Sequence, residues 1–149
     1  MDSAKIPIIK LYGNLVVPIQ VALSDQLVAR LKDDVSNEIE ASSPWGLVID
    51  VSGVDIMDSY ITRTIRDIAL IARLMGVRTV LSGMAPMIAM TLVEMGMELA
   101  GVATELNLEL ALERLRIERE ETGIAAGARQ AERSEGRVER ATGDGEARK

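Results

Sequence analysis

The fold is decided by the stretch GLVIDV (46–51) together with VDIMDSYITRTI (54–65), which follows it closely. The first run is apolar except for Asp50, and a short run of this kind predicts a central strand covered on both faces. A helical pattern then begins at Asp58-Ser59, and Asp and Ser are residues that helix N-termini prefer. The stretch therefore predicts a buried strand, a short polar loop and a helix whose N-terminus holds the Ser59 hydroxyl beside the sheet.

Strand and helix patterns alternate on both sides of this stretch. Two β-branched runs joined by Gly13-Asn14 predict an opening hairpin, because Gly and Asn tolerate positive φ. Ser24 is an expected N-cap, and Gly76 is the expected left-handed residue after the second helix. The expected strands are 6–12, 15–21, 46–51, 77–81 and 98–104, and the expected helices are 24–42, 58–75, 86–95 and 106–121. The order ββαβαβαβα predicts an α/β fold with a mixed, mostly parallel sheet and packed helices.

The length of the chain and a change of composition after Thr122 predict one domain followed by a tail. A chain of 149 residues suits a single hydrophobic core. The last residues are rich in Gly, Ala, Arg and Glu and have few large apolar side chains, so they cannot support a core. We therefore expect a folded domain over 1–121 and a disordered charged tail over 122–149.

The composition excludes several classes of function. The chain has no Cys and no His, which removes thiolate nucleophiles, Cys/His zinc sites and every His-based triad. It also lacks a Gly-rich phosphate loop, and Asp50 has no neighbouring ligand cluster, so it is interpreted as a residue that caps its loop. We expect no catalytic residue, no metal and no cofactor, and the chain is not expected to be an enzyme.

Charge and hydropathy restrict the partners and the location. The net charge is −6 and only three residues are aromatic, which disfavours nucleic acid and anionic membranes as partners. No apolar run approaches the roughly 20 residues needed to span a bilayer. The N-terminus lacks the basic and apolar regions of a secretory signal, so a cytoplasmic protein is expected.

Two roles can be weighed for Ser59 from the residues alone. It could accept a phosphate at an exposed helix N-terminus, where backbone N–H groups hold phosphate oxygens, or Asp58 or Ser59 could simply cap the helix. Helix capping is the commoner role of Asp and Ser at such positions, so the spacing by itself favours a cap. Thr62 could be a second acceptor or an ordinary threonine bonded to its own helix, and Ser52 could serve the loop backbone. Arg63 could pair with acids of a partner or belong to a solvated helix face.

The segment from Gly46 to Gly96 resembles the STAS domain of anti-sigma-factor antagonists, in particular the RsbS-like subunits of the bacterial stressosome. The matching parts are the strand that ends in Asp50, the loop DIMDS (55–59), the step from Gly76 to Thr79 and the helix after Gly83. The resemblance covers roughly residues 5–118, and the D-x-x-D-S segment is its most specific part. The residues after Thr122 depart from this pattern.

The resemblance implies a phosphorylation switch with defined partners. It implies that Ser59 is the phosphoacceptor, and that Asp55, Asp58, Ser59, Thr62 and Arg63 form a partner-binding surface. An unphosphorylated subunit of this kind holds a small GHKL-type serine kinase (RsbT-like) in a large hetero-oligomer with RsbR-like STAS paralogues. Phosphorylation releases the kinase, which activates a PP2C-type phosphatase, and a separate reset phosphatase restores the serine.

Two other functions stay open beside this one. The chain could be a free anti-anti-sigma factor that binds an anti-sigma kinase directly, in which case it would form a small complex. It could also be a ligand-binding STAS module, which would need a pocket. The size of the native particle separates the first alternative from a stressosome subunit.

Overall fold

A five-stranded sheet forms the centre of the fold in the computed structural model, which describes residues 5–20, 22–99 and 101–146. Its strands follow one another in space as they do in the sequence: β1 (Ile9–Leu11), β2 (Asn14–Pro18), β3 (Gly46–Asp50), β4 (Arg78–Ser82) and β5 (Ala103–Glu105). Only β1 and β2 pair in the antiparallel direction, and the other neighbouring pairs are parallel. The expected mixed, mostly parallel sheet is confirmed.

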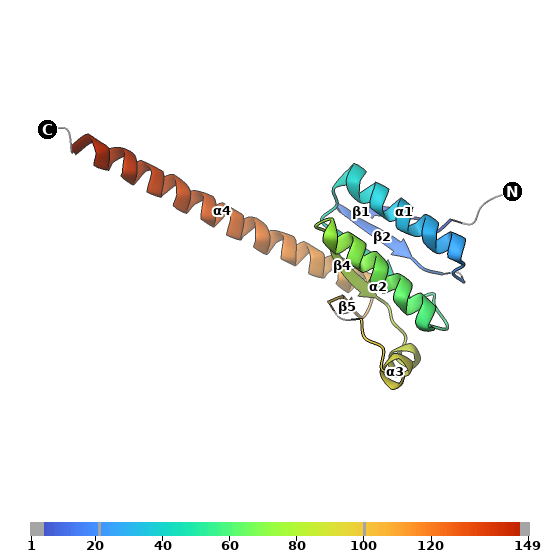
Figure 1. Cartoon of the computed structure of the whole chain (residues 1–149). Coiled ribbons are helices and arrows are strands. Elements are labelled where there is room, and N and C mark those ends of the chain that lie inside the picture. The colour runs from blue at the N-terminus through green and yellow to red at the C-terminus, as the bar shows by residue number, and fades with distance from the viewer. Residues whose placement is uncertain (1–4, 21, 100, 147–149) are drawn as a thin grey trace. The chain divides into compact units, whose positions relative to one another are not determined.

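Four helices complete the expected element order ββαβαβαβα (Figure 1). They are α1 (Asp25–Ser42), α2 (Ser59–Leu74), α3 (Pro86–Glu94) and α4 (Leu108–Glu146). The Ser24 hydroxyl caps α1 by accepting a hydrogen bond from the Leu27 N–H at 3.1 Å. Gly76 has the positive φ, 84°, that was expected just after α2. Both helix-end predictions are therefore confirmed.

The two faces of the sheet bury different apolar residues because successive strand residues point to opposite faces. Leu47 and Ile49 of β3 face a core formed with α1, α2 and α3, whereas Val48 faces a smaller core formed with the first turns of α4. Figure 1 shows α1 and α2 lying side by side over the sheet. Covered in this way on both faces, β3 is the buried central strand that its apolar run predicted.

The opening hairpin turns one residue earlier than expected. The prediction put Gly13-Asn14 in the turn, but Leu11 pairs with Asn14, so the two turn residues are Tyr12 and Gly13. Both have positive φ, 51° and 79°, the conformation that a two-residue hairpin turn requires. Asn14 is instead the buried first residue of β2, and its side-chain amide approaches the Tyr12 carbonyl at 3.5 Å.

The C-terminal part of the chain differs from the expected disordered tail. The last helix was expected to end at 121, but α4 continues as one helix to Glu146. The chain divides into two units, Met1–Leu115 and Arg116–Lys149, and we call Arg116–Glu146 the α4 extension. Disorder was expected because residues 122–149 cannot form a hydrophobic core. The backbone hydrogen bonds of a helix join residues four apart in the chain, so they can form without such a core.

Within the described residues, none of the helices combines the length and the hydropathy that a bilayer crossing requires.

Candidate functional site

Ser59 is the first residue of α2, and the helix is capped by the residue before it. The Asp58 carboxylate accepts a hydrogen bond from the Ile61 N–H at 2.8 Å, which satisfies one of the free N–H groups at the helix end. Ser59 itself is exposed, and its hydroxyl has no hydrogen-bond partner among the described residues. The capping role therefore belongs to Asp58, and the Ser59 hydroxyl is accessible from solvent.

The loop before Ser59 is held at the edge where the parallel strands end. The Asp50 carboxylate accepts a hydrogen bond from the Ser52 N–H at 2.9 Å, which is the loop-capping contact expected of it. The Val51 N–H donates to the Ser82 carbonyl of β4, also at 2.9 Å. Met57 is buried in the main core. These contacts fix the loop on both sides, so the exposed residues around Ser59 occupy a defined position.

The side chains that this loop exposes are two acids, one apolar residue and one hydroxyl. Asp55, Ile56, Asp58 and Ser59 are all exposed, and we call these four residues the Ser59 corner. Ile56 is 77% exposed although it is large and apolar, while its neighbour Met57 is only 4% exposed. An exposed isoleucine between two carboxylates is a feature that the sequence analysis did not single out. Which of Ile56 and Met57 faces the core depends on how the loop packs, and both residues are apolar, so the sequence does not show which of them is exposed.

Thr62 does not belong to the exposed surface, in contrast to the expectation from the resemblance. Its side chain is 1% exposed, and its hydroxyl donates to the Asp58 carbonyl at 2.8 Å. Thr64 is buried as well, and its hydroxyl donates to the Tyr60 carbonyl at 2.9 Å. Both threonines thus bond to their own helix, and neither hydroxyl faces solvent. Arg63 is exposed one turn along α2 from Ser59.

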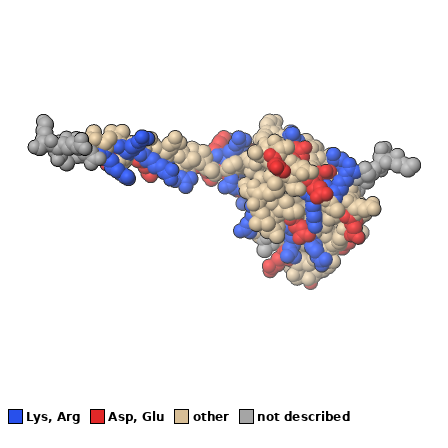
Figure 2. Space-filling model, turned by 45° about the horizontal axis from the view of Figure 1, so that its top comes forward, with Lys and Arg blue, Asp and Glu red and all other residues tan. Residues whose placement is uncertain are grey.

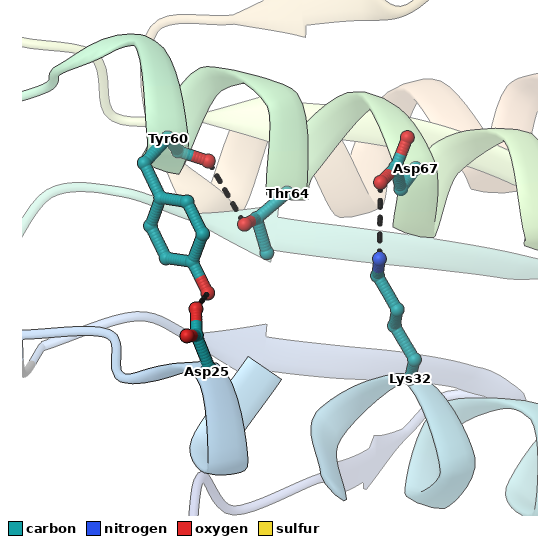
Figure 3. A network of polar contacts seen from close by, with 5 residues as sticks. All are labelled: Asp25, Lys32, Tyr60, Thr64 and Asp67. Atoms are coloured by element: carbon teal, nitrogen blue, oxygen red, sulfur yellow. Dashed lines mark hydrogen bonds and ion pairs between the residues drawn. The ribbon is translucent and has the colours of Figure 1, made fainter. Parts of the chain in front are cut away.

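Two polar contacts join α2 to α1, one at the first turn of α2 and one in its middle (Figure 3). The Tyr60 hydroxyl donates to the Asp25 carboxylate at 2.7 Å, and the Lys32 ammonium lies 3.0 Å from the Asp67 carboxylate. The hydrogen bond to Asp25 is the main reason why the pKa of Tyr60 is raised above its ordinary 10.0, with desolvation and the charges of Asp25 and Asp58 adding to it. No sequence pattern indicates either pair, because 35 residues separate the partners in both.

Among the described residues, no group of three or more acidic side chains is placed to hold a metal ion. The Ser59 corner exposes a hydroxyl, two carboxylates and an apolar side chain. These groups suit the binding of a macromolecule and the acceptance of a phosphoryl group.

The family model for the STAS domain matches residues 5–114, which contain all five strands and the Ser59 corner. The chain is 26% identical over 114 residues to the RsbT co-antagonist protein RsbRA of Bacillus subtilis. That alignment spans 76% of this chain and 42% of the relative. The related RsbRD is 29% identical over 67% of this chain and 36% of its own length. The chain thus spans less than half the length of these relatives.

Solved structures give nearly complete matches to smaller proteins. A serine-to-glutamate variant of RsbS from Moorella thermoacetica superposes with a TM-score of 0.68 at 38% identity, over 77% of this chain and 97% of the relative. A chain from a structure of the molecular architecture of the stressosome superposes with a TM-score of 0.66 at 41% identity, over 74% of this chain and 96% of that chain. The anti-sigma-factor antagonist SpoIIAA in its unphosphorylated form shares the fold at 15% identity and a TM-score of 0.57. The chain belongs to the STAS domain family and is related within it to RsbS.

Proposed function

We propose that this chain is a stressosome subunit that holds an RsbT-like serine kinase while Ser59 is unphosphorylated and releases it when Ser59 carries a phosphate. The observation that carries the proposal is the Ser59 hydroxyl, which is exposed at the first residue of α2 and makes no hydrogen bond within the part of the chain that the structure describes. The similarity to RsbS and to the RsbT co-antagonists supports the choice of partner. The chain acts as a non-catalytic scaffold together with RsbR-like paralogues in the cytoplasm, and a reset phosphatase removes the phosphate.

The charges of the corner explain how a phosphate would act. Asp55 and Asp58 are both exposed beside Ser59, so the unmodified corner already carries two negative charges. A phosphate adds about −1.5 to −2 at neutral pH. In a close interface these charges would have to be desolvated together, which is costly unless the partner offers cations. The phosphorylated corner is therefore a poor fit for a surface that accepts the neutral one.

The same geometry supports a switch in which the domain stays folded. The Ser59 hydroxyl makes no hydrogen bond to another described residue that a phosphate would break, and the N-terminus of a helix favours negative charge through its dipole and its free N–H groups. Thr62, in contrast, could not carry a phosphate without bringing a charge into the core. The switch thus changes the surface charge of a constant scaffold, and Ser59 is the hydroxyl placed to do this.

The test measures kinase capture with a purified RsbT-type kinase. Ser59→Asp is expected to weaken binding at least about tenfold, which corresponds to roughly 1.4 kcal/mol, whereas Ser59→Ala should retain binding and resist release by ATP. Asn37→Asp is the matched control, because it adds the same charge at an exposed position within α1, away from both ends of that helix. Equal binding by Ser59→Asp and the parent chain would contradict the charge mechanism.

Mass spectrometry after incubation with the kinase and ATP tests the acceptor itself. A single phosphate on Ser59 is expected, and the Ser59→Ala chain should remain unmodified. A phosphate on Ser52 or Thr62 would move the switch to another residue. Chromatography of the native particle with its paralogues completes the test, since a small complex would instead favour the free anti-sigma antagonist.

A further inference from the structure

The α4 extension exposes a regular apolar stripe in a part of the chain that the STAS match does not include. The match ends at residue 114, and the extension begins at Arg116. Ile117, Ile124 and Val138 are large apolar residues of this helix, and they are 42%, 74% and 63% exposed. Ala131 is exposed as well. These four residues are separated by steps of seven, so they lie in one line along the helix.

We propose that the α4 extension pairs with the same segment of a second copy of this chain in a parallel, in-register coiled coil. A coiled coil repeats apolar residues at two core positions of each heptad, and two-stranded parallel pairs carry β-branched residues at the first and Leu at the second. Three of the four residues at the first core position, Ile117, Ile124 and Val138, are β-branched, whereas the second core position has no leucine. The four residues are called the seam below.

The residues between the seam positions permit close approach of a second helix. The second core position of each heptad is occupied by Glu120, Gly127, Ser134 and Ala141, of which the last three are small. A Cβ added to Gly127 would have no atom of the described residues within 4 Å, so none of these residues requires its smallness. Glycine inside a helix costs about 1 kcal/mol relative to alanine. A partner helix packed closely on this side gives these small residues a role.

The charges beside the seam favour a parallel over an antiparallel partner. The flanking positions are the residue just before each seam residue and the residue four after it. In a parallel, in-register pair, a residue just before the seam meets the residue five positions further along the second copy. Arg116 then faces Glu121 of the second copy, and Gln130 faces Glu135, so no like charges meet at these flanking positions. In an antiparallel pair with the seam aligned, Arg116 would face Arg137 and Glu121 would face Glu135. The flanking charges are therefore complementary in the parallel direction only, and the one pair of like charges in the parallel dimer is Glu120 with its own copy.

Three other arginines of the α4 extension lie outside the interface between the two helices. Arg129, Arg133 and Arg140 lie on the far side of the helix from the seam, and Figure 2 shows blue side chains gathered along the extension. Glu120, the one charged residue among the core positions, is bonded to Arg116 of its own chain at 2.7 Å. Pairing along the seam thus buries apolar side chains together with the Glu120 carboxylate and its bond to Arg116, and it leaves the arginine side in water.

Single cysteines introduced into the full-length chain test direction and register, because the natural sequence contains none. Ile117→Cys and Val138→Cys are each expected to form a disulfide-linked dimer under mild oxidation, since each faces itself in a parallel pair. Ala126→Cys, two residues from the seam residue Ile124, is the matched control and should form no disulfide-linked dimer. Linkage only when the two variants are mixed would show an antiparallel pair and overturn the proposal, as would no linkage.

Sedimentation equilibrium tests the strength of the association. Ile124→Glu should weaken self-association of the full-length chain at least about tenfold, because it places two charges opposite each other in the seam. Ala126→Glu adds the same residue outside the seam and should leave association unchanged. Equal association by both variants and the parent chain would overturn the proposal. Far-UV circular dichroism of each variant reports whether the helix itself is kept, and the cysteine experiment does not depend on this substitution.

Discussion

α2 and the α4 extension are both helices of at least four turns, but they meet their surroundings in opposite ways. α2 buries one side, including Ile65 and Ile68, in the main core and leaves only its N-terminal corner and its outer face to solvent. The α4 extension buries none of its large apolar side chains within its own chain. A helix with a buried side can hold a single hydroxyl in a fixed place, whereas a helix with an exposed stripe is a surface for a partner.

The largest difference between the two helices is expected when one isoleucine is truncated in each. Ile65→Ala should lower the free energy of unfolding by about 2–5 kcal/mol, because Ile65 is fully buried and its loss leaves a cavity. Ile124→Ala should change the unfolding of the domain by less than about 0.5 kcal/mol. Urea denaturation, followed at a protein concentration where the chain is monomeric, measures both. Equal losses would show that the extension is packed as α2 is.

The corner of α2 can be tested by removing its cap. Asp58→Ala should lower the free energy of unfolding by about 1 kcal/mol, since the Ile61 N–H loses its acceptor. Asp55→Ala removes the same charge from a residue that has no resolved hydrogen bond among the described residues, and it should have little effect on stability. Thermal denaturation of the two variants distinguishes a capping role from a general effect of charge. A larger loss for Asp55→Ala would reverse the roles of these acids.

The helix of the α4 extension can be stabilised by a substitution outside the seam. Gly136 lies on the side away from the seam, and an added Cβ would have no atom within 4 Å. Gly136→Ala should therefore stabilise the helix by about 0.5–1 kcal/mol. The helical signal in circular dichroism should rise, and the cysteine linkage at Val138 should be maintained. A fall in helical signal would place Gly136 at a contact that the chain alone does not contain.

The smallest effect concerns the link from Tyr60 to Asp25. The pKa of Tyr60 is raised, chiefly by the hydrogen bond that its hydroxyl donates to Asp25, so the folded state favours the protonated phenol. This contribution is present below the ordinary tyrosine pKa and is lost as the pH rises through the raised value. The stability difference between the parent chain and Tyr60→Phe should accordingly shrink above pH 10. A difference that grows with pH would contradict the assigned donor.

Much of the fold and part of the site could be predicted from short-range patterns. The apolar run that ends in Asp50 predicted the central strand, and Asp58-Ser59 predicted the start of α2 within one residue. Such features depend on near neighbours, so they can be found without knowing the packing. The hairpin was misplaced by one residue because Tyr12, a bulky residue, adopts the positive φ that Gly and Asn usually supply.

The sequence by itself determined the element order, the cap of α1, the start of α2 and the acidic, hydroxyl-bearing character of the corner around Ser59. Only the tertiary structure decided which hydroxyl is accessible, since Ser59 and Thr62 differ by which side of α2 the core covers. It also decided that Ile56 faces solvent while Met57 faces the core, and that Tyr60 reaches Asp25. The physical reason is the same in each case: local patterns fix the backbone, whereas burial depends on elements that are distant in the chain.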